Sequence, residues 1–268
     1  MPKKILFINQ EITPYVPESP MATLGQQLPE KIREKGFEIR TFMPKWGIIN
    51  ERRGQLHEVI RLSGMNITID DNDHPLLIKV ASIPVSRVQV YFIDNEDYFT
   101  RRKMEIDENG EEYADNGERA IFYARGVLET VKKLRWDPDV IICQGWMGAI
   151  VPLYLKMVYN DEPCFAGTKI ITSIFHEHLK NDIGVNFKHC LEFREVTSET
   201  LKQYNDNFNS LELGKLAIDF SDGVVIAASN ANSELCDYSK SKNIPVLDFP
   251  GEDFSEAYSN FFEEITKE

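Results

Sequence analysis

Residues 4–43, KILFINQEITPYVPESPMATLGQQLPEKIREKGFEIRTFM, contain the pattern that decides the fold. The apolar run Lys4–Asn9 predicts a buried strand, Thr23–Lys35 has helical spacing, and Phe37–Met43 predicts a second strand. Strand, helix and strand in this order form a parallel βαβ unit. The turn before the helix is unusual, because residues 14–20, PYVPESP, carry three prolines and an acid where phosphate-binding turns are rich in glycine.

The rest of the chain repeats the alternation of short apolar runs and longer helical patterns, which predicts a mainly parallel sheet covered on both faces. The further expected strands are Leu76–Ser82, Gln89–Ile93, Val140–Cys143, Lys169–Ile174, Gly223–Ala227 and Pro245–Leu247. The further expected helices are Gly117–Arg135, Gly148–Tyr159, Val196–Phe220, Ser229–Ser239 and Asp253–Lys267. We expect a hairpin in Arg61–Asp73 and a polar loop in Asp94–Asn116. The chain is therefore predicted to form one Rossmann-like α/β domain of three layers over residues 1–268, with the terminal helix 253–267 packed back on it.

The composition restricts the partners that the protein can have. Of its 268 residues, 30 are Lys or Arg and 43 are Asp or Glu, so the formal net charge is -13. Nucleic acids and anionic membranes both attract clustered positive charge, so neither is expected as a partner. The N-terminal apolar run is too short for a secretory signal, and no later run is long enough to span a membrane. We therefore expect a soluble, cytoplasmic protein.

The cysteine spacing and the absence of familiar motifs limit the kinds of metal, cofactor and catalytic site that we expect. Cys143, Cys164, Cys190 and Cys236 lie far apart without Cys-x-x-Cys spacing, which indicates buried thiols rather than disulfides or a zinc site. The sequence contains no P-loop, no dinucleotide-binding Gly-x-Gly-x-x-Gly, no Gly-x-Ser-x-Gly elbow and no His-Glu-x-x-His pair. No cofactor and no metal ion are therefore expected.

Polar and aromatic side chains follow three of the expected strands, at the edge where open α/β sheets bind ligands. Glu11 follows the first strand, while Gln144, Trp146 and His176 follow two later ones. Glu11 can contact a ligand, or it can serve as a helix cap or turn partner. Trp146 can stack on a sugar or base, or it can fill the junction between strand and helix. Both interpretations stay open for each residue.

The string FHEHLK, residues 175–180, carries further acid–base groups. His176, Glu177 and His178 could act in proton transfer or bind a metal ion. A metal site needs another ligand at a defined spacing, and none is evident, so a polar loop after the strand is the favoured interpretation.

Six strings between Lys4 and about Tyr238 are distinctive: KILFINQEITPY, LPEKIREKGFEIRTFMPKWG, VYFIDNEDYFTRR, YADNGERAIFYARGVLE, WDPDVIICQGWMGAIVPLYLK and KLAIDFSDGVVIAAS. Together they resemble the N-terminal catalytic domain of bacterial glycogen and starch synthases. Those enzymes are glycosyltransferases with two Rossmann-like domains that transfer glucose from ADP-glucose to an α-1,4-glucan. The resemblance therefore implies a Rossmann-like fold and a place in glycogen or starch synthesis.

The donor-binding turn of that family is changed in this sequence. The family has a Lys-x-Gly-Gly-Leu string that approaches the diphosphate of the donor. Here Pro17 replaces the lysine, and Ser19 and Pro20 replace the two glycines. The acidic residue that follows in the family aligns with Thr23, whereas Glu11 matches the family's glutamate. Prolines remove N–H donors and an added acid brings negative charge, so this degenerate turn is predicted to repel a sugar nucleotide.

Two histidine-containing strings of the family are altered as well. The string His-Ala-His-Asp-Trp-His becomes ICQGWM, residues 142–147, in which Trp146 is kept and Gln144 replaces a histidine. A second string, Thr-Val/Ile-His-Asn, has a histidine that contacts the transferred glucose. An alignment without a gap places that histidine on Phe175, and a shift of one residue places it on His176.

The resemblance also implies a second Rossmann-like domain that holds most of the nucleotide. The sequence stops where that domain would begin, after a terminal helix that looks like a finished end. A single lost electrostatic contact to a leaving group costs ~10²–10³ in rate, so the chain alone is predicted to be inactive. Three hypotheses follow: a binding or regulatory module of glucan metabolism, a glucosyltransferase half completed by a partner chain or oligomer, or a sugar- or nucleotide-binding protein that reuses the cleft. The expected ligands are α-glucan or a sugar nucleotide.

Overall fold

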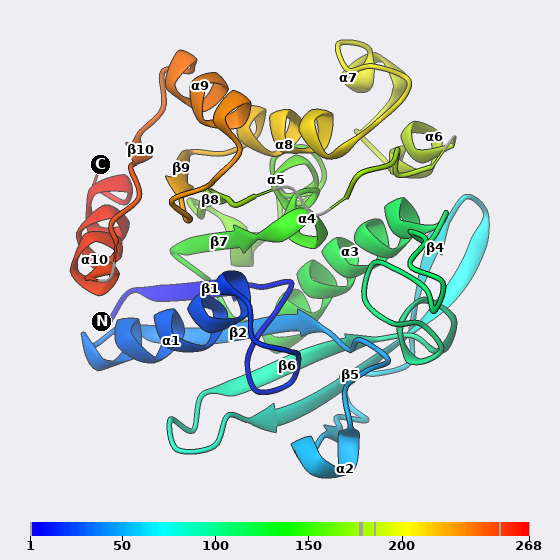
Figure 1. The fold of residues 1–268 in the computed structure, drawn as a ribbon, viewed down its shortest axis with the longest axis horizontal. Helices are drawn as coiled ribbons and strands as arrows, with labels where there is room; N and C mark the ends of the chain where they lie inside the picture. The colour runs from blue at the N-terminus through cyan, green and yellow to red at the C-terminus, as the bar shows by residue number, and fades with distance from the viewer. Residues whose placement is uncertain (1, 177–178, 185, 252, 268) are drawn as a thin grey trace.

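The computed structural model describes residues 2–176, 179–184, 186–251 and 253–267. Glu177 and His178, which belong to the expected polar loop, lie outside the described residues. The strands are β1 Lys4–Ile8, β2 Glu38–Pro44, β3 His57–Glu58, β4 Met65–Ile69, β5 Asn72–Ser82, β6 Gln89–Asp94, β7 Val140–Gln144, β8 Lys169–Ile174, β9 Gly223–Ile226 and β10 Val246–Leu247. They form one sheet in the order β10-β9-β8-β7-β1-β2-β6-β5-β3, with β4 paired to β5 (Figure 1).

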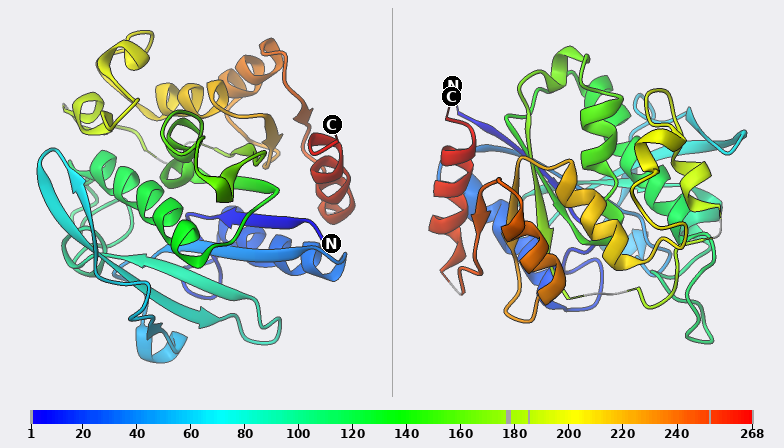
Figure 2. Two further views of the ribbon diagram at one scale, coloured as in Figure 1. Left: turned by 180° about the vertical axis from the view of Figure 1, so that it is seen from behind. Right: turned by 90° about the horizontal axis from the view of Figure 1, so that it is seen from above.

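Helices lie on both faces of this sheet (Figure 2). The α-helices are α1 Pro20–Glu34, α2 Glu51–Gly54, α3 Asn116–Leu134, α4 Gly145–Gly148, α5 Val151–Met157, α6 Phe187–Leu191, α7 Ser198–Leu201, α8 Ser210–Asp219, α9 Ser233–Ser241 and α10 Phe254–Ile265. Helices α1 and α10 share a buried apolar cluster with one face, and α3, α4, α5 and α8 share another cluster with the opposite face. The expected three-layer, mainly parallel α/β fold is confirmed.

The strand order places a switch point beside β1. This strand pairs in parallel with β2 on one side and with β7 on the other, so the chain proceeds outward from β1 in two directions. Antiparallel pairing is confined to the far side of the sheet, where β5 pairs with β6, β3 and β4. Open α/β sheets bind ligands at the carboxyl ends of the strands that flank such a switch point. Here these are the ends of β1 and β7.

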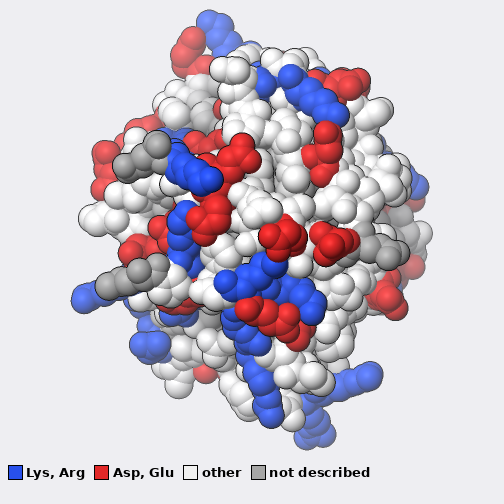
Figure 3. Space-filling model, turned by 90° about the vertical axis from the view of Figure 1, so that its left-hand side faces the viewer, with Lys and Arg blue, Asp and Glu red and all other residues white. Residues whose placement is uncertain are grey.

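The C-terminal helix α10 packs back on the face that β1 and α1 form. The ring of Phe262 is fully buried, and its centroid lies 6.4 Å from those of Phe7 and Phe37. An ion pair of 2.7 Å joins Lys3 to Glu263 of this helix. Basic and acidic side chains are intermixed over this side of the molecule (Figure 3). Aromatic packing and ion pairs therefore hold the two ends of the chain together.

The prediction of one long helix over Val196–Phe220 is wrong. The structure has two helices instead, α7 and α8, separated by residues 202–209. Asn209 is the N-cap of α8, and its side-chain oxygen accepts a hydrogen bond of 3.0 Å from the N–H of Glu212. An N-cap residue has extended backbone geometry, so it separates two helices even where apolar spacing continues.

Two further helices begin elsewhere than expected. The helix predicted over Gly148–Tyr159 is found as α5, which begins at Val151 after the separate short helix α4. Pro152 lies in the first turn of α5, where the helix needs no N–H from it. Helix α9 begins at Ser233 rather than Ser229, because the Asn232 side chain caps it. A side-chain cap therefore marks the start of α9, and a proline in the first turn marks the start of α5.

The connecting segments carry more structure than their polarity indicated. The expected hairpin is formed by β4 and β5, and its turn residues Asp70 and Asp71 both have positive φ. The expected polar loop contains a π-helix, η1 Glu96–Thr100, and a 3₁₀ helix, η2 Pro163–Phe165, lies elsewhere. All four cysteines are free, and the two at 143 and 190 are buried. Among the described helices, none combines the length and apolar character needed to cross a bilayer.

Candidate functional site at the carboxyl ends of β1, β7 and β8

A small pocket lies at the switch edge of the sheet. Its volume is about 70 Å³, and its lining includes Trp146, His176 and Met21. His176 is exposed at this pocket, whereas Trp146 is 7% exposed. Glu11 and Gln144, the other two residues predicted from the sequence, lie nearby but do not line it. The structure therefore brings two of the four predicted residues into one pocket.

Three buried polar side chains form a row across the neighbouring strand ends, and we call Asn9, Gln144 and Ser173 the polar row. Gln144 lies opposite Ser173 in the ladder, and Ile8 lies opposite Cys143, which places Asn9 level with Gln144. Asn9 and Gln144 are 0% exposed and Ser173 is 6% exposed. The row is thus buried at the switch point.

The side chains of the polar row bond to no other described protein group. Both side-chain polar atoms of Asn9 and of Gln144 are unpaired, as is the hydroxyl of Ser173. The indole N–H of Trp146 beside them is unpaired too. A buried polar atom without a partner costs about 1–3 kcal/mol. Several such atoms in one place are a functional-site signal, since ordinary cores avoid them.

Sequence reasoning selected Gln144 but missed Asn9 and Ser173. Both are polar residues at or near the end of a run of Ile, Leu and Phe, in KILFIN and KIITSI. That signal was present in the sequence, but the strand register was needed to show that the three residues lie side by side.

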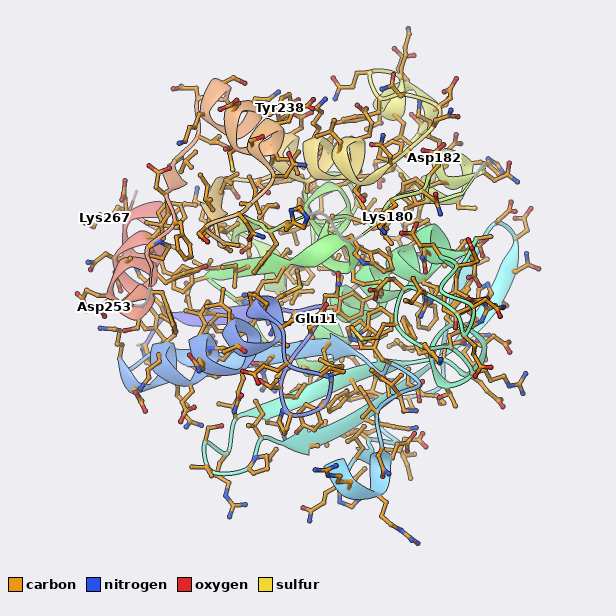
Figure 4. All side chains as sticks on the ribbon, viewed as in Figure 1. Glu11, Lys180, Asp182, Tyr238, Asp253 and Lys267 are labelled. Carbon is orange, nitrogen blue, oxygen red and sulfur yellow. The ribbon has the colours of Figure 1, made fainter. Side chains whose placement is uncertain are left out.

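Glu11 is a turn partner in this structure. It is 5% exposed, and its carboxylate accepts hydrogen bonds from the Ser19 hydroxyl and, at 3.2 Å, from the Gln10 amide. Figure 4 places Glu11 at the connection between β1 and α1. Helix α1 lies directly on this segment, because a Cβ added at Gly25 would be 2.3 Å from the carbonyl oxygen of Glu11.

The altered turn residues form the start of α1, which begins at Pro20 and not at Thr23 as expected. Ser19 is the N-cap, and its hydroxyl accepts a 2.9 Å hydrogen bond from the N–H of Ala22. Pro20 occupies the first turn without an N–H, and Thr23 donates its N–H to the Ser19 carbonyl. Pro17 is exposed before the cap. Helix N-termini attract anions through free N–H groups, and here the cap, the proline and the Glu11 carboxylate occupy that position.

The pocket contains an imidazole but no fixed positive charge. None of the described residues that line it is Lys or Arg. Phe175 is 8% exposed and belongs to the apolar cluster under α1 and α10, and both it and His176 line the pocket. Within the described ranges, no group of three or more His, Cys, Asp or Glu side chains is arranged to hold a metal ion.

Trp146 also fills the strand-to-helix junction. Its ring centroid lies 6.4 Å from that of Trp46, whose indole N–H donates to the Gln10 carbonyl at 2.8 Å. The preceding residue, Gly145, has φ 76°, and a Cβ there would be 2.4 Å from the Gln10 side chain. The chain after β7 is therefore packed tightly against the chain after β1, and Trp146 borders both the core and the pocket.

The open, mainly parallel sheet with buried polar side chains at its switch point defines a Rossmann-like α/β fold. The model of the family described as "Starch synthase catalytic domain" matches residues 4–244. The chain belongs to this family, which confirms the resemblance seen in the sequence.

Individual relatives agree with this assignment. A glycogen synthase of Chlorobium limicola is 36% identical over 212 residues, which are 79% of this chain and 43% of that protein. A glycogen synthase of Chlorobaculum tepidum is 38% identical over 172 residues, which are 64% of this chain and 35% of that protein. The chain thus spans less than half the length of these relatives.

The fold is also that of a solved structure, the catalytic domain of starch synthase IV from Arabidopsis thaliana bound to ADP and acarbose. The TM-score is 0.72 at 16% sequence identity, and the match covers 93% of this chain and 51% of that one. At this identity the likeness shows the fold alone.

Proposed function

We propose that this domain binds a neutral sugar, the end of a glucan chain, at the polar row, and that it does not transfer glucose by itself. It would then serve as a binding or regulatory module of glucan metabolism. One observation supports this function: the polar row and Trp146 offer unpaired neutral donors and acceptors, and no described Lys or Arg lines the adjacent pocket. Sugar hydroxyls pair with amides and hydroxyls, whereas a diphosphate needs positive charge.

The start of α1 adds to the argument against a sugar nucleotide. The Glu11 carboxylate is held there by the Ser19 hydroxyl, and Pro20 contributes no N–H. A negative charge at this point opposes the approach of a phosphate. The ordinary donor reaction of the family therefore lacks its electrostatic requirement in this part of the site.

The pocket must open to admit a sugar. Ligand pockets commonly measure about 300–1,000 Å³, and this one measures about 70 Å³. Met21 in the first turn of α1 lines it and is 2% exposed. Methionine side chains are unbranched and adapt easily. Binding would displace Met21 and give the polar row its missing partners.

Isothermal titration calorimetry with maltotriose and with ADP-glucose, in separate experiments, tests the proposal. We expect binding of maltotriose and none of ADP-glucose. The variant Gln144→Met removes two unpaired polar atoms at similar volume and should abolish maltotriose binding. Thr41→Val is the matched control, because the Thr41 hydroxyl is also buried and unpaired but lies outside the polar row. It should bind like the unaltered protein.

Three results would count against the proposal. Transfer of radiolabelled glucose from ADP-glucose to glycogen by the purified chain alone would show a complete catalytic site. Transfer that appears on mixing with a separately produced second domain would support the alternative of a glucosyltransferase half completed by a partner chain. Absence of maltotriose binding would remove the sugar-binding role.

A further inference from the structure

A second, larger hollow lies on another part of the sheet, and we call it the hairpin groove. It is lined by residues 14–15 and 48–50, the end of α2, the start of β3, the end of β5 and residues 84–89 of the β5–β6 hairpin, and its volume is about 920 Å³. Figure 1 shows α2 beside β5 and the hairpin that joins β5 to β6. The groove shares no lining residue with the pocket at the polar row.

Unpaired positive charge lines the hairpin groove. Arg53 and Arg87 are exposed, and within the described chain neither side chain forms an ion pair or a hydrogen bond. His57 is exposed beside them. The protein as a whole has a net charge of -13, and many other basic side chains are paired with acids. Free arginines gathered in one groove therefore attract a carboxylate ligand.

Unusual backbone geometry is concentrated at the same place. Gln55, Val85 and Arg87 have φ values of 54°, 70° and 60°, and all three line the groove. The left-handed region is costly for a β-branched residue such as valine. Val85 is nonetheless 96% exposed, so the strain presents an apolar side chain to solvent rather than to the core. Strain of this kind clusters at binding sites.

The groove also exposes the edge of a strand. Strand β3 pairs with β5 at Lys79 and Val80 and reaches no further. The Ile78 carbonyl accepts a hydrogen bond of 2.8 Å from the N–H of Val59, on the β3 side of β5. Backbone groups of a strand point alternately to its two sides, so every second residue of β5 from Ile78 directs its N–H and C=O groups toward the β3 side. Ser82 is the next such residue beyond Val80, and it lines the groove. An open strand edge is a template for an extended chain.

A buried hydroxyl without a partner borders the groove. Tyr15 is 8% exposed, its hydroxyl bonds to no other described protein group, and burial raises its pKa to about 12. This observation is independent of the arginines and of the strand edge. All three point to a ligand with its own hydrogen-bonding groups.

We propose that the hairpin groove binds an extended acidic segment of a partner protein, which pairs with the β5 edge at Ser82 and places carboxylates against Arg53 and Arg87. The apolar side chains Val85 and Ile48, 96% and 40% exposed, would contact alternate residues of that segment. A glucan fits less well, because the aromatic side chain in the lining, Tyr15, is buried and offers no open face for stacking. This inference does not depend on the function proposed for the polar row.

A displayed library of random short peptides, selected on the immobilised full chain, tests the proposal. We expect selected sequences in which Asp or Glu alternates with Val, Ile or Thr. The double variant Arg53→Ala/Arg87→Asn should bind the most enriched fluorescein-labelled peptide about tenfold or more weakly, because asparagine tolerates positive φ but carries no charge. Arg52→Ala/Arg61→Ala is the matched control, since both arginines are exposed outside the groove, and it should bind normally.

Hydrogen–deuterium exchange on the same complex adds a readout of strand pairing, in which the Ser82 amide should exchange more slowly when the peptide is bound. Selected peptides without acidic residues, or equal affinity of the two double variants, would overturn the proposal. Dimerisation that Arg53→Ala/Arg87→Asn abolishes would assign the groove to a second copy of this chain instead. Protection of the groove by maltoheptaose would assign it to glucan.

Discussion

The pocket at the polar row and the hairpin groove differ in what each leaves unpaired. At the polar row, neutral amide and hydroxyl groups are buried without partners, and the neighbouring carboxylate of Glu11 is already bonded to Ser19. In the hairpin groove, the unpaired groups are exposed arginines beside an open strand edge. One sheet thus borders a small pocket whose described lining contains no Lys or Arg and a larger groove lined by free arginines.

The difference extends to the place of free positive charge. Residues 17–20, which we predicted to replace the family's donor turn, lead into a capped helix start, while free positive charge lies at Arg53 and Arg87. Charge attracts anions only where it is preorganised near them. A net charge alone therefore predicts less about ligands than the place of a few unpaired cations.

The largest expected effect concerns the tight contact between α1 and the chain that follows β1. Gly25→Ala would place a Cβ 2.3 Å from the Glu11 carbonyl oxygen, so α1 has to shift. We expect a loss of about 3 kcal/mol in the free energy of unfolding, measured by urea denaturation. Gln27→Ala, at an exposed position of the same helix, should change stability little. Equal stability of the two variants would show that α1 is not held against Glu11.

A smaller effect should come from rebuilding the family's turn. The combined substitution Pro17→Lys, Ser19→Gly and Pro20→Gly removes the helix cap and the hydroxyl partner of Glu11. It also raises the conformational entropy of the unfolded chain. We expect a loss of about 2 kcal/mol in stability and no ADP-glucose binding by calorimetry. Detectable ADP-glucose binding would mean that the turn alone closes the donor site, and the contrast between the two regions would weaken.

The polar row should respond in the opposite direction. Gln144→Met replaces two unpaired buried atoms by an apolar side chain of similar size, so the free energy of unfolding should rise by about 1 kcal/mol. Thermal unfolding followed by circular dichroism measures the change. A stability loss would indicate that Gln144 has partners in solution, such as ordered water, and that it is not held ready for a ligand.

The smallest effect concerns Glu51, the first residue of α2, which follows Asn50 of the hairpin groove. Burial alone would raise the pKa of Glu51, but its hydrogen bonds with Lys45 and Lys79 hold the pKa below the ordinary value of 4.5. The stability from these bonds is present above about pH 4.5 and is lost as the pH falls through the lower folded-state pKa. Glu51 is partly exposed, so we expect less than about 1 kcal/mol.

Urea denaturation at several pH values measures this loss on the acid side. Glu51→Gln should be less stable than the unaltered protein at neutral pH, and the difference between the two should shrink as the pH falls below 4. An unchanged difference across that range would show that the ionisation of Glu51 does not contribute to the loss of stability in acid.

Sequence patterns predicted the sheet well and the helix boundaries less well. The apolar runs for β1, β7 and β8 are found within a residue or so of the structure, because buried parallel strands need continuous apolar residues. The helix expected over Val196–Phe220 is wrong, since apolar spacing continues across a stretch that the Asn209 cap interrupts. Periodicity reports one buried face, and it does not report where capping ends a helix.

The candidate site was predicted only in part for a related reason. Strand order in the sequence was enough to select Glu11, Gln144, Trp146 and His176, because they follow strands. Asn9 and Ser173 could be recognised as site residues only from the strand register, which aligns them with Gln144. The sequence also left open whether Glu11 contacts a ligand or a turn. Its bonds to Ser19 and Gln10 favour the turn.

By itself, the sequence determined the α/β class, the family and the negative net charge, since these depend on residue identity and order along the chain. Only the tertiary structure decided which polar groups lack a partner, both in the polar row and in the hairpin groove. The physical reason is that a hydrogen bond or an ion pair depends on distance in space. Strand pairing brings Asn9 and Ser173 into one row, and the folding of α2 against the β5–β6 hairpin brings Arg53 and Arg87 into one groove.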